Sequence, residues 1–302
     1  KPTAVIPVAQ RLRMVADDPC NISLDDVYKG FCQEVGRDSG TVADFFRKEV
    51  GRLLDEDKTQ NEQDANKKLD AEQEIKKMVF KKISREMVES DILLRHVEGV
   101  FGSSERTYQF RRVFTKQLAV NGLIQHMFGV VDRTPSKFSW NMLNGQMLSP
   151  DFRLNYNNQG FLEGGSLPYR MTRNVQRLVG PLMLQGSFVP SMGSAAIAIR
   201  SYKEEVSSIL CLLLRDDIVS WYTSKSSARS DVKTQELERQ LLDRILKNVA
   251  LVQSRLKECA PTIVDHQVSG DDPIDKRIRE LLERATSAEE LSKMPITYQP
   301  WL

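Results

Sequence analysis

One turn-rich segment, residues 132–172, interrupts a sequence that otherwise shows the apolar spacing of helices. On both sides of it, apolar residues recur three and four positions apart, which is typical of amphipathic helices. Inside it, Phe138–Trp140 and Gln146–Leu148 flank Asn144-Gly145. Asn-Gly between two apolar runs favours a β-hairpin. The pattern predicts a mainly α fold with one small β element.

The helices themselves follow from this spacing and from polar residues at their starts. Ser23, with Asp25 and Asp26, supplies the polar start of a first helix that runs through Gly30-Phe31. Pro7 within AVIPVA favours an edge strand or the end of a strand. Further helices are expected over 42–54, 75–100 (one or two), 105–131, 180–199, 204–222, 231–259 and 273–285. For 105–131 the expected buried side consists of Phe110, Val113, Phe114, Leu118, Leu123 and Phe128.

Residues 55–74, DEDKTQNEQDANKKLDAEQE, are almost wholly polar. This composition predicts a solvated insertion or a flexible loop. The small-residue run Gly186–Ala198 lacks the lysine of a phosphate-binding loop, and it favours close helix packing instead.

Composition excludes several function classes. The 43 basic and 41 acidic residues leave a net charge of +2, which gives no general case for binding nucleic acid or membranes. The longest apolar runs, Ile209–Leu214 and Val113–Val131, are too short or too polar to cross a bilayer. Four scattered cysteines indicate reduced, structural thiols of an intracellular protein. Three histidines leave little material for a zinc site or a catalytic triad.

Two aspartates suggest the chemistry of a kinase. Phosphoryl transfer needs a carboxylate to orient the attacking hydroxyl, an Asn and an Asp to hold metal ions, and a phosphate-cradling loop with a Lys. Asp132 is a candidate for the first carboxylate, and Asp151, nineteen residues later, is a candidate metal ligand.

The residues around these aspartates do not suit that chemistry. Lys137 stands where the Asn is expected, and its positive charge competes with a magnesium ion. Arg153 stands where a Gly follows the second aspartate, and it either crowds a phosphate or pairs with Asp151. No GxGxxG or GxxxxGK[ST] pattern occurs. The simpler alternative is that Asp132 and Asp151 are turn residues.

The order of these signals resembles the C-terminal lobe of a phosphatidylinositol-3-kinase-related kinase, followed by its short FATC segment. QFRRVFTKQLAVNGLIQHMFGVVDR is similar to the helix that leads into the family's catalytic loop. That loop normally reads GDRHxxN, whereas here Thr134 replaces its His and Lys137 its Asn. LPYRMTRNVQ, LLLRDDIVSWY and the final KRIRELLERATSAEELSKMPITYQPWL resemble the TRRAP-type pseudokinase branch of the family.

The resemblance implies a fold and a division of the chain. The fold is a mainly α, kinase-like C-lobe with a small β-hairpin, completed by a FATC helix-hairpin. The expected parts are an inter-lobe hinge (1–20), the start of the C-lobe (21–54), the polar insertion or flexible loop (55–74), the pseudokinase C-lobe (75–260), a linker (261–272) and the FATC segment (273–302).

The resemblance also implies a function. It predicts a catalytically inactive scaffold segment of a nuclear transcription coactivator subunit, shared by histone acetyltransferase complexes such as SAGA. Its partners are the subunits of those complexes and transcriptional activators, with no direct nucleic acid or membrane contact. Asp132, Thr134, Lys137, Asp151 and Arg153 are then degenerate kinase positions that hold no cofactor or metal. The alternatives are an active serine/threonine kinase of the same family and a helical interaction module without kinase ancestry.

Overall fold

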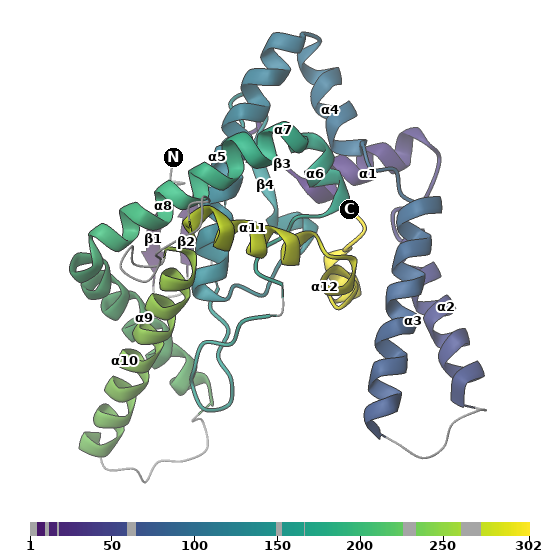
Figure 1. Ribbon diagram of the computed structural model, residues 1–302. Coiled ribbons are helices and arrows are strands. Elements are labelled where there is room, and N and C mark those ends of the chain that lie inside the picture. The colour runs from purple at the N-terminus through teal and green to yellow at the C-terminus, as the bar shows by residue number, and fades with distance from the viewer. Residues whose placement is uncertain are drawn as a thin grey trace.

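The computed structural model describes residues 5–9, 12–16, 18–58, 65–148, 153–165, 167–225, 234–260 and 273–302. It is mainly helical, as the sequence predicts, and it contains two small sheets where one small β element is expected (Figure 1). The hairpin of helices α2 (Thr41–Lys58) and α3 (Ala65–Glu86) projects from one side of the molecule, and the hairpin of α9 (Lys203–Lys225) and α10 (Thr234–Cys259) projects from the other.

The strands form two antiparallel sheets. Strands β1 (Val5–Ala9) and β2 (Leu12–Val15) pair with each other, which confirms a strand around Pro7. The second sheet has the order β3-β4-β5 and consists of β3 (Asn21–Ser23), β4 (Ser139–Asn141) and β5 (Met147–Leu148). Trp140 lies opposite Ile22 on one side and Met147 on the other. The predicted hairpin is therefore present, and Gly145 in its turn has the left-handed backbone that favours glycine (φ 70°).

The first half of the helical part contains α1 (Leu24–Glu34), α2 (Thr41–Lys58), α3 (Ala65–Glu86), α4 (Ile92–Phe101) and α5 (Ser104–Phe128). A capping box starts α1, because the Asp26 N–H donates to Ser23 Oγ (3.2 Å) and the Ser23 N–H donates to Asp26 Oδ2 (3.1 Å). Of the six residues predicted on the buried side of α5, five are buried. Val113 is the exception, with 38% of its surface exposed.

The polar stretch 55–74 departs from the flexible-loop alternative. Residues 55–58 end α2 and residues 65–74 begin α3, while 59–64 lie outside the described residues. Ion pairs along the helices, such as Arg52–Glu56 (2.6 Å) and Lys76–Glu72 (2.6 Å), join residues one turn apart. Residues 55–58 and 65–74 are therefore helical and do not form a flexible loop, and such ion pairs support the polar parts of both helices.

The second half contains α6 (Arg173–Val179), α7 (Pro181–Met183), the π-helical turn η2 (Leu184–Phe188), α8 (Val189–Ser201), α9 (Lys203–Lys225) and α10 (Thr234–Cys259). Glycines bring α8 close to its neighbours. A Cβ on Gly193 of α8 would lie 3.3 Å from Ile274 and Ile278, and one on Gly122 of α5 would lie 3.2 Å from Met192. The close packing predicted for this small-residue run is confirmed.

The stretch Pro181–Ser201 meets the length and composition expected of a membrane-crossing helix, and it is the one helix in the described part of the chain that does so. The prediction that no stretch of the sequence is long and apolar enough to cross a bilayer is therefore wrong. The helix lies along α5 and α11, and Val189, Met192 and Ala196 are buried there. Core helices of water-soluble proteins pass the same criterion.

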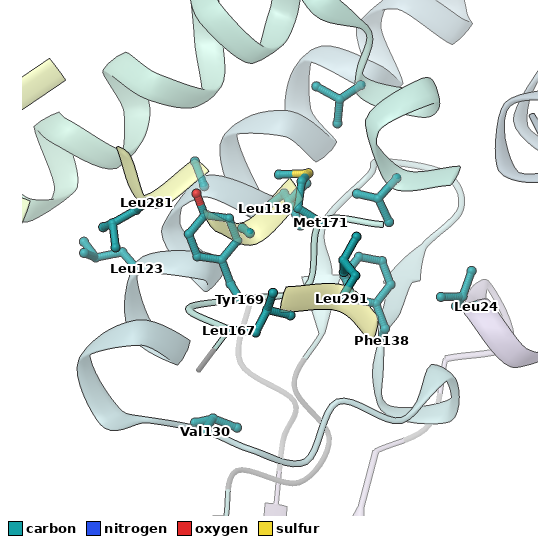
Figure 2. Close-up of a cluster of buried hydrophobic side chains, with 14 of the residues drawn as sticks. Leu24, Leu118, Leu123, Val130, Phe138, Leu167, Tyr169, Met171, Leu281 and Leu291 are labelled. Atoms are coloured by element: carbon teal, nitrogen blue, oxygen red, sulfur yellow. The ribbon is translucent and has the colours of Figure 1, made fainter. Parts of the chain in front are cut away.

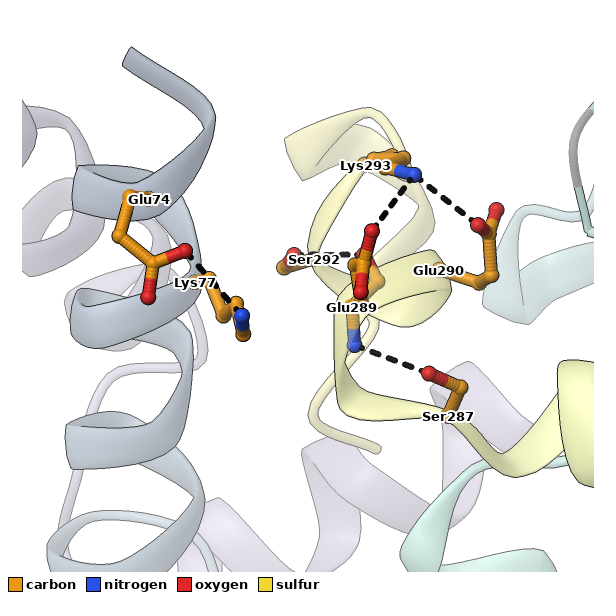
Figure 3. Close-up of polar contacts among 7 residues, drawn as sticks. All are labelled: Glu74, Lys77, Ser287, Glu289, Glu290, Ser292 and Lys293. Carbon is orange, nitrogen blue, oxygen red and sulfur yellow. Dashed lines mark hydrogen bonds and ion pairs between the residues drawn. The ribbon is translucent and has the colours of Figure 1, made fainter. Parts of the chain in front are cut away.

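The C-terminal segment folds as α11 (Pro273–Thr286), α12 (Ala288–Ser292) and the 3-10 turn η4 (Ile296–Tyr298). Residues 273–302 contain no strand, so the expected helix-hairpin is built from helices alone. Ser287 caps α12 by accepting the Glu289 N–H, and Lys293 bridges Glu289 and Glu290 (Figure 3). Helix α12 packs beside α3, which joins this segment to the α2–α3 hairpin.

The hydrophobic core lies where α5 meets the turn-rich segment and the C-terminal helices. Figure 2 shows Leu118 and Leu123 of α5 near Tyr169 and Met171, with Leu281 and Leu291 arriving from α11 and α12. Residues far apart in the sequence thus share one core. Val130 and Phe138, at the two ends of the loop after α5, belong to the same core.

Candidate functional site

The candidate site is the loop after α5, which corresponds to the predicted catalytic loop. Helix α5 ends at Phe128, and the left-handed backbone of the next residue, Gly129 (φ 62°), lets the chain turn back. The Val130 N–H donates to the Gln125 carbonyl (3.0 Å) and completes this C-cap. The chain then runs to the 3-10 turn η1 (Pro135–Lys137), which has a proline at its first position. The loop from 130 to 137 is thereby held at both ends.

Asp132 is paired within this loop. Its carboxylate forms an ion pair with Lys137 Nζ and accepts from the backbone N–H (3.4 Å) and hydroxyl (3.3 Å) of Thr134. Burial acts to raise the pKa of Asp132, but the hydrogen bonds from Lys137 and Thr134 outweigh it, so the pKa lies below its usual value. The predicted residues Asp132, Thr134 and Lys137 therefore meet in one small polar cluster.

The cluster is a poor site for a divalent cation. A metal ion at Asp132 would share the carboxylate with the Lys137 ammonium, which already pairs with it. Lys137 stands at the position where the kinase family that this loop resembles has the amide oxygen of an Asn. Like charges at this distance repel strongly. In the part of the chain that the structure describes, no three His, Cys, Asp or Glu side chains lie close enough to hold a metal ion.

The other two predicted residues, Asp151 and Arg153, follow this loop in the sequence. Arg153 is exposed at the start of the described stretch 153–165. Asp151 lies outside the described residues. The pairing of Arg153 with Asp151 stays a prediction.

Arg133 points into the protein instead of toward Asp132. Only 6% of its surface is exposed. Its Nε donates to the Val130 carbonyl (3.0 Å) and a terminal nitrogen donates to the Pro168 carbonyl (3.0 Å). Burial lowers the pKa of Arg133 to about 10. Arg133 thus fixes the loop of residues 130–137 to the stretch that leads into α6.

Arg170 joins this loop to the C-terminal segment. It is almost fully buried and donates to the carbonyls of Arg133 (2.8 Å) and Tyr298. Its second terminal nitrogen donates to the backbone oxygens of Gln299 (3.0 Å) and Leu302 (3.3 Å). Burial, followed by the nearby charge of Arg133, lowers the pKa of Arg170 to about 9. One side chain therefore organises four backbone acceptors from both segments.

The C-terminal residues themselves form one side of the site. The pKa of Tyr298 is raised by burial and next by the negative charge of Asp132. Trp301 and Leu302 are buried, and the Trp301 ring packs against Phe46 of α2 with their centroids 5.8 Å apart. The sequence did not predict Arg170 or Tyr298 as site residues. LPYRMT resembles a family motif, but the motif does not indicate what its arginine contacts.

The stretch 153–165 is fixed to α10. Buried Asn248 donates to the Gly160 carbonyl (2.9 Å) and accepts the Leu162 N–H (2.8 Å). A Cβ on Gly164 would lie 3.1 Å from the Arg255 guanidinium, which itself donates to the Met127 carbonyl (3.2 Å). Helix α10 thus holds this stretch close to the end of α5.

His126, near the end of α5, is a buried neutral residue. Burial and the charges of Arg255, Arg284 and Arg133 lower its pKa to about 4. The carboxylate of Glu258 lies 3.8 Å from Nε2, which is too far for a hydrogen bond, and it is 62% exposed. His126 is therefore a core histidine and not a base that titrates near neutral pH.

The pKa of His126 predicts a pH dependence. The unfolded state takes up its proton near pH 6.5 and the folded state only near pH 4, so stability is complete above pH 6.5 and falls below it. We expect a loss of about 2 kcal/mol by pH 5. Hydrogen exchange of the α5 amides in the full-length protein, corrected for intrinsic rates, measures this loss. A His126→Gln variant should lack most of it, and an equal loss in that variant would contradict the assignment.

Comparison with known proteins shows that the sequence and the fold are similar to those of kinases. The family described as phosphatidylinositol 3- and 4-kinase matches residues 13–223. The FAT and kinase domain of CtTel1 superposes with a TM-score of 0.64 and 14% identity, covering 99% of this chain and 18% of that one. At that identity the likeness concerns the fold alone.

Several named proteins are similar in sequence. The SAGA complex/NuA4 acetyltransferase complex subunit Tra1 of Schizosaccharomyces pombe is 22% identical over 99% of this chain and 8% of its own length. The human transformation/transcription domain-associated protein is 24% identical over 99% of this chain and 7% of its own length. The serine/threonine-protein kinase ATR of Arabidopsis thaliana is 24% identical over 67% of this chain and 7% of its own length. The chain therefore spans less than a tenth of each of these relatives.

Proposed function

Since the chain belongs to the phosphatidylinositol 3- and 4-kinase family, as a TRRAP-type member of the PI3K-related kinases, we propose that it is a catalytically inactive scaffold. In this proposal residues 75–260 are a pseudokinase C-lobe and residues 273–302 a FATC segment that completes it. The preceding residues supply the inter-lobe hinge (1–20), the start of the lobe (21–54) and the polar insertion (55–74), and 261–272 form a linker.

The observation that carries the proposal is the ion pair of Lys137 with Asp132. A working kinase needs that carboxylate to accept the hydrogen bond of an attacking hydroxyl and an amide five residues later to hold a metal ion. Here the carboxylate is already neutralised by the residue that replaces the amide. The negative charge of Asp132 is therefore balanced within the loop, without a nucleotide or a metal ion.

The proposed context is a transcription coactivator subunit. Relatives that match nearly the whole chain carry the names of SAGA and NuA4 acetyltransferase complex subunits. We infer that the full-length protein is a nuclear component of such an acetyltransferase complex, where this segment docks other subunits and transcriptional activators. It needs no cofactor for that role, and it makes no direct contact with nucleic acid or membrane.

Calorimetric titration of the full-length protein with ATP and magnesium tests the proposal. The expected result is no binding at millimolar nucleotide. Magnesium-dependent binding in the micromolar range that disappears in an Asp151→Ala variant would refute it.

A gain-of-binding variant tests whether residues 134, 137 and 153 are what prevents nucleotide binding. Combining Lys137→Asn, Thr134→His and Arg153→Gly frees Asp132 and restores the His and Asn of the family's loop and the Gly after Asp151, so affinity for magnesium and ATP should rise at least tenfold. The matched control replaces exposed Lys116 of α5 by Asn in place of the Lys137 change, and its affinity should equal that of the unmodified protein. Equal affinity of the triple variant and the control would show that these positions are not what blocks the site.

An active serine/threonine kinase is the second candidate. The match to the ATR kinase and the retained Asp132 favour it. In that case the unmodified full-length protein would show magnesium-dependent phosphorylation that Asp132→Asn abolishes. The scaffold proposal predicts no such activity in either protein.

A further inference from the structure

A polar groove lies where α1, α6 and the turn between α3 and α4 meet, away from the loop that holds Asp132. Its volume is about 410 Å³. Four arginines line it, from three separate parts of the chain: Arg37, Arg85, Arg173 and Arg177. Convergence of positive charge on a concave surface is the usual arrangement for binding an anion.

Three of these arginines are available to a ligand. Arg173 and Arg177 are one turn apart on α6, so their side chains share a helix face. Among the described residues, Arg85, Arg173 and Arg177 form no hydrogen bond or ion pair. A guanidinium without a partner keeps all its donors for bidentate contacts to a phosphate or carboxylate.

Hydrogen bonds hold the walls of the groove in place. Arg37 donates to the Met87 carbonyl (2.7 Å) and so fixes the end of α1 to the turn. Buried Asn174 of α6 donates to the Glu89 carbonyl of the same turn (2.9 Å). Because both walls are tied to one turn, the arginines are positioned before a ligand arrives, which lowers the entropic cost of binding.

The negative charges of the groove narrow the choice of ligand. Glu86, Glu89 and Asp91 also line it, and Arg95 engages Glu89 and Asp91 from outside the lining. A run of acidic residues would meet these carboxylates and be repelled. A single compact group with two negative charges, flanked by basic residues, matches both the arginines and the carboxylates.

We propose that this groove binds a phosphoserine or phosphothreonine of a partner protein, with Arg173 and Arg177 contacting the phosphate. A basic residue beside the phosphorylated one lies against Glu86, since Arg95 already pairs with Glu89 and Asp91. The site uses no residue of the Asp132 cluster, so its test is independent of the scaffold proposal.

Fluorescence anisotropy of the full-length protein tests the inference. The probe is a labelled peptide that carries one phosphoserine between two lysines, and the unphosphorylated peptide is its reference. We expect the phosphorylated peptide to bind at least tenfold more tightly. The Arg173→Glu, Arg177→Glu pair should weaken it at least tenfold, and the Arg173→Gln, Arg177→Gln pair should weaken it in the same direction with less effect on folding.

The matched control is Arg215→Glu with Arg279→Glu, which makes the same charge change at exposed positions on α9 and α11. Its affinity should stay within twofold of the unmodified protein. Inorganic phosphate should compete only at far higher concentration than the peptide. Equal binding of both peptides, equal loss in the control pair, or equal competition by inorganic phosphate would each overturn the assignment.

Discussion

Replacing Arg170 by methionine is expected to release the C-terminal segment from the catalytic loop. Methionine fills similar space but removes the Arg170 donors from four backbone oxygens. The Gln299 oxygen keeps the Leu302 N–H (3.1 Å), so three acceptors are orphaned, and each orphaned buried acceptor costs about 1–3 kcal/mol. Burial lowers the Arg170 pKa to about 9, so burying this charge is itself unfavourable. Removing the charge therefore offsets part of the destabilisation. We expect a net local destabilisation of about 3 kcal/mol, because the orphaned acceptors outnumber the single charge removed.

Hydrogen exchange of the full-length protein measures this effect. The amides of Tyr298 and Leu302, which donate within the turn around η4, should exchange about a hundredfold faster in Arg170→Met. Arg215→Met is the control, since Arg215 is exposed on α9 and its replacement should change exchange little. Unchanged protection at residues 298–302 would show that Arg170 does not hold this segment.

Replacing Trp301 by alanine is expected to separate the same segment from α2. Trp301 is 2% exposed and packs on Phe46, and truncating a buried tryptophan typically costs about 3–5 kcal/mol. The amides of α2 around Phe46 should lose protection together with those of residues 296–302. Tyr202→Ala, at an aromatic residue that is 63% exposed, is the control and should leave both regions unaffected. If α2 keeps its protection in Trp301→Ala, the contact does not stabilise the hairpin.

Local signals allowed much of the fold to be predicted. The capping residues Ser23 and Asp26 mark the start of α1, and Asn144-Gly145 marks the β4–β5 turn, because each depends only on neighbouring residues. Residues 65–74 were harder because they have no apolar periodicity. Their helix rests on charge pairs and on packing of α3 against α2, which the composition alone does not reveal.

The sequence allowed the central pair of the candidate site, Asp132 and Lys137, to be predicted, but not the surrounding residues Arg170 and Tyr298. Lys137 lies five residues from Asp132, so a short loop brings them together and their pairing follows from charge. Arg170 and Tyr298 join the site from 37 and 166 residues beyond the loop residues Arg133 and Asp132. No local pattern specifies contacts over such separations, which depend on the whole packed core.

The contacts of Arg170 also set an order for folding during synthesis. The catalytic loop and α6 leave the ribosome well before residues 298–302, so the Arg170 guanidinium lacks three of its four acceptors until those residues arrive. A charged side chain that is not yet paired stays hydrated and keeps the core around it open. We therefore expect the loop to reach its final form only after residues 298–302 have docked, and a chain that lacks these residues to expose an incomplete core to chaperones and proteases.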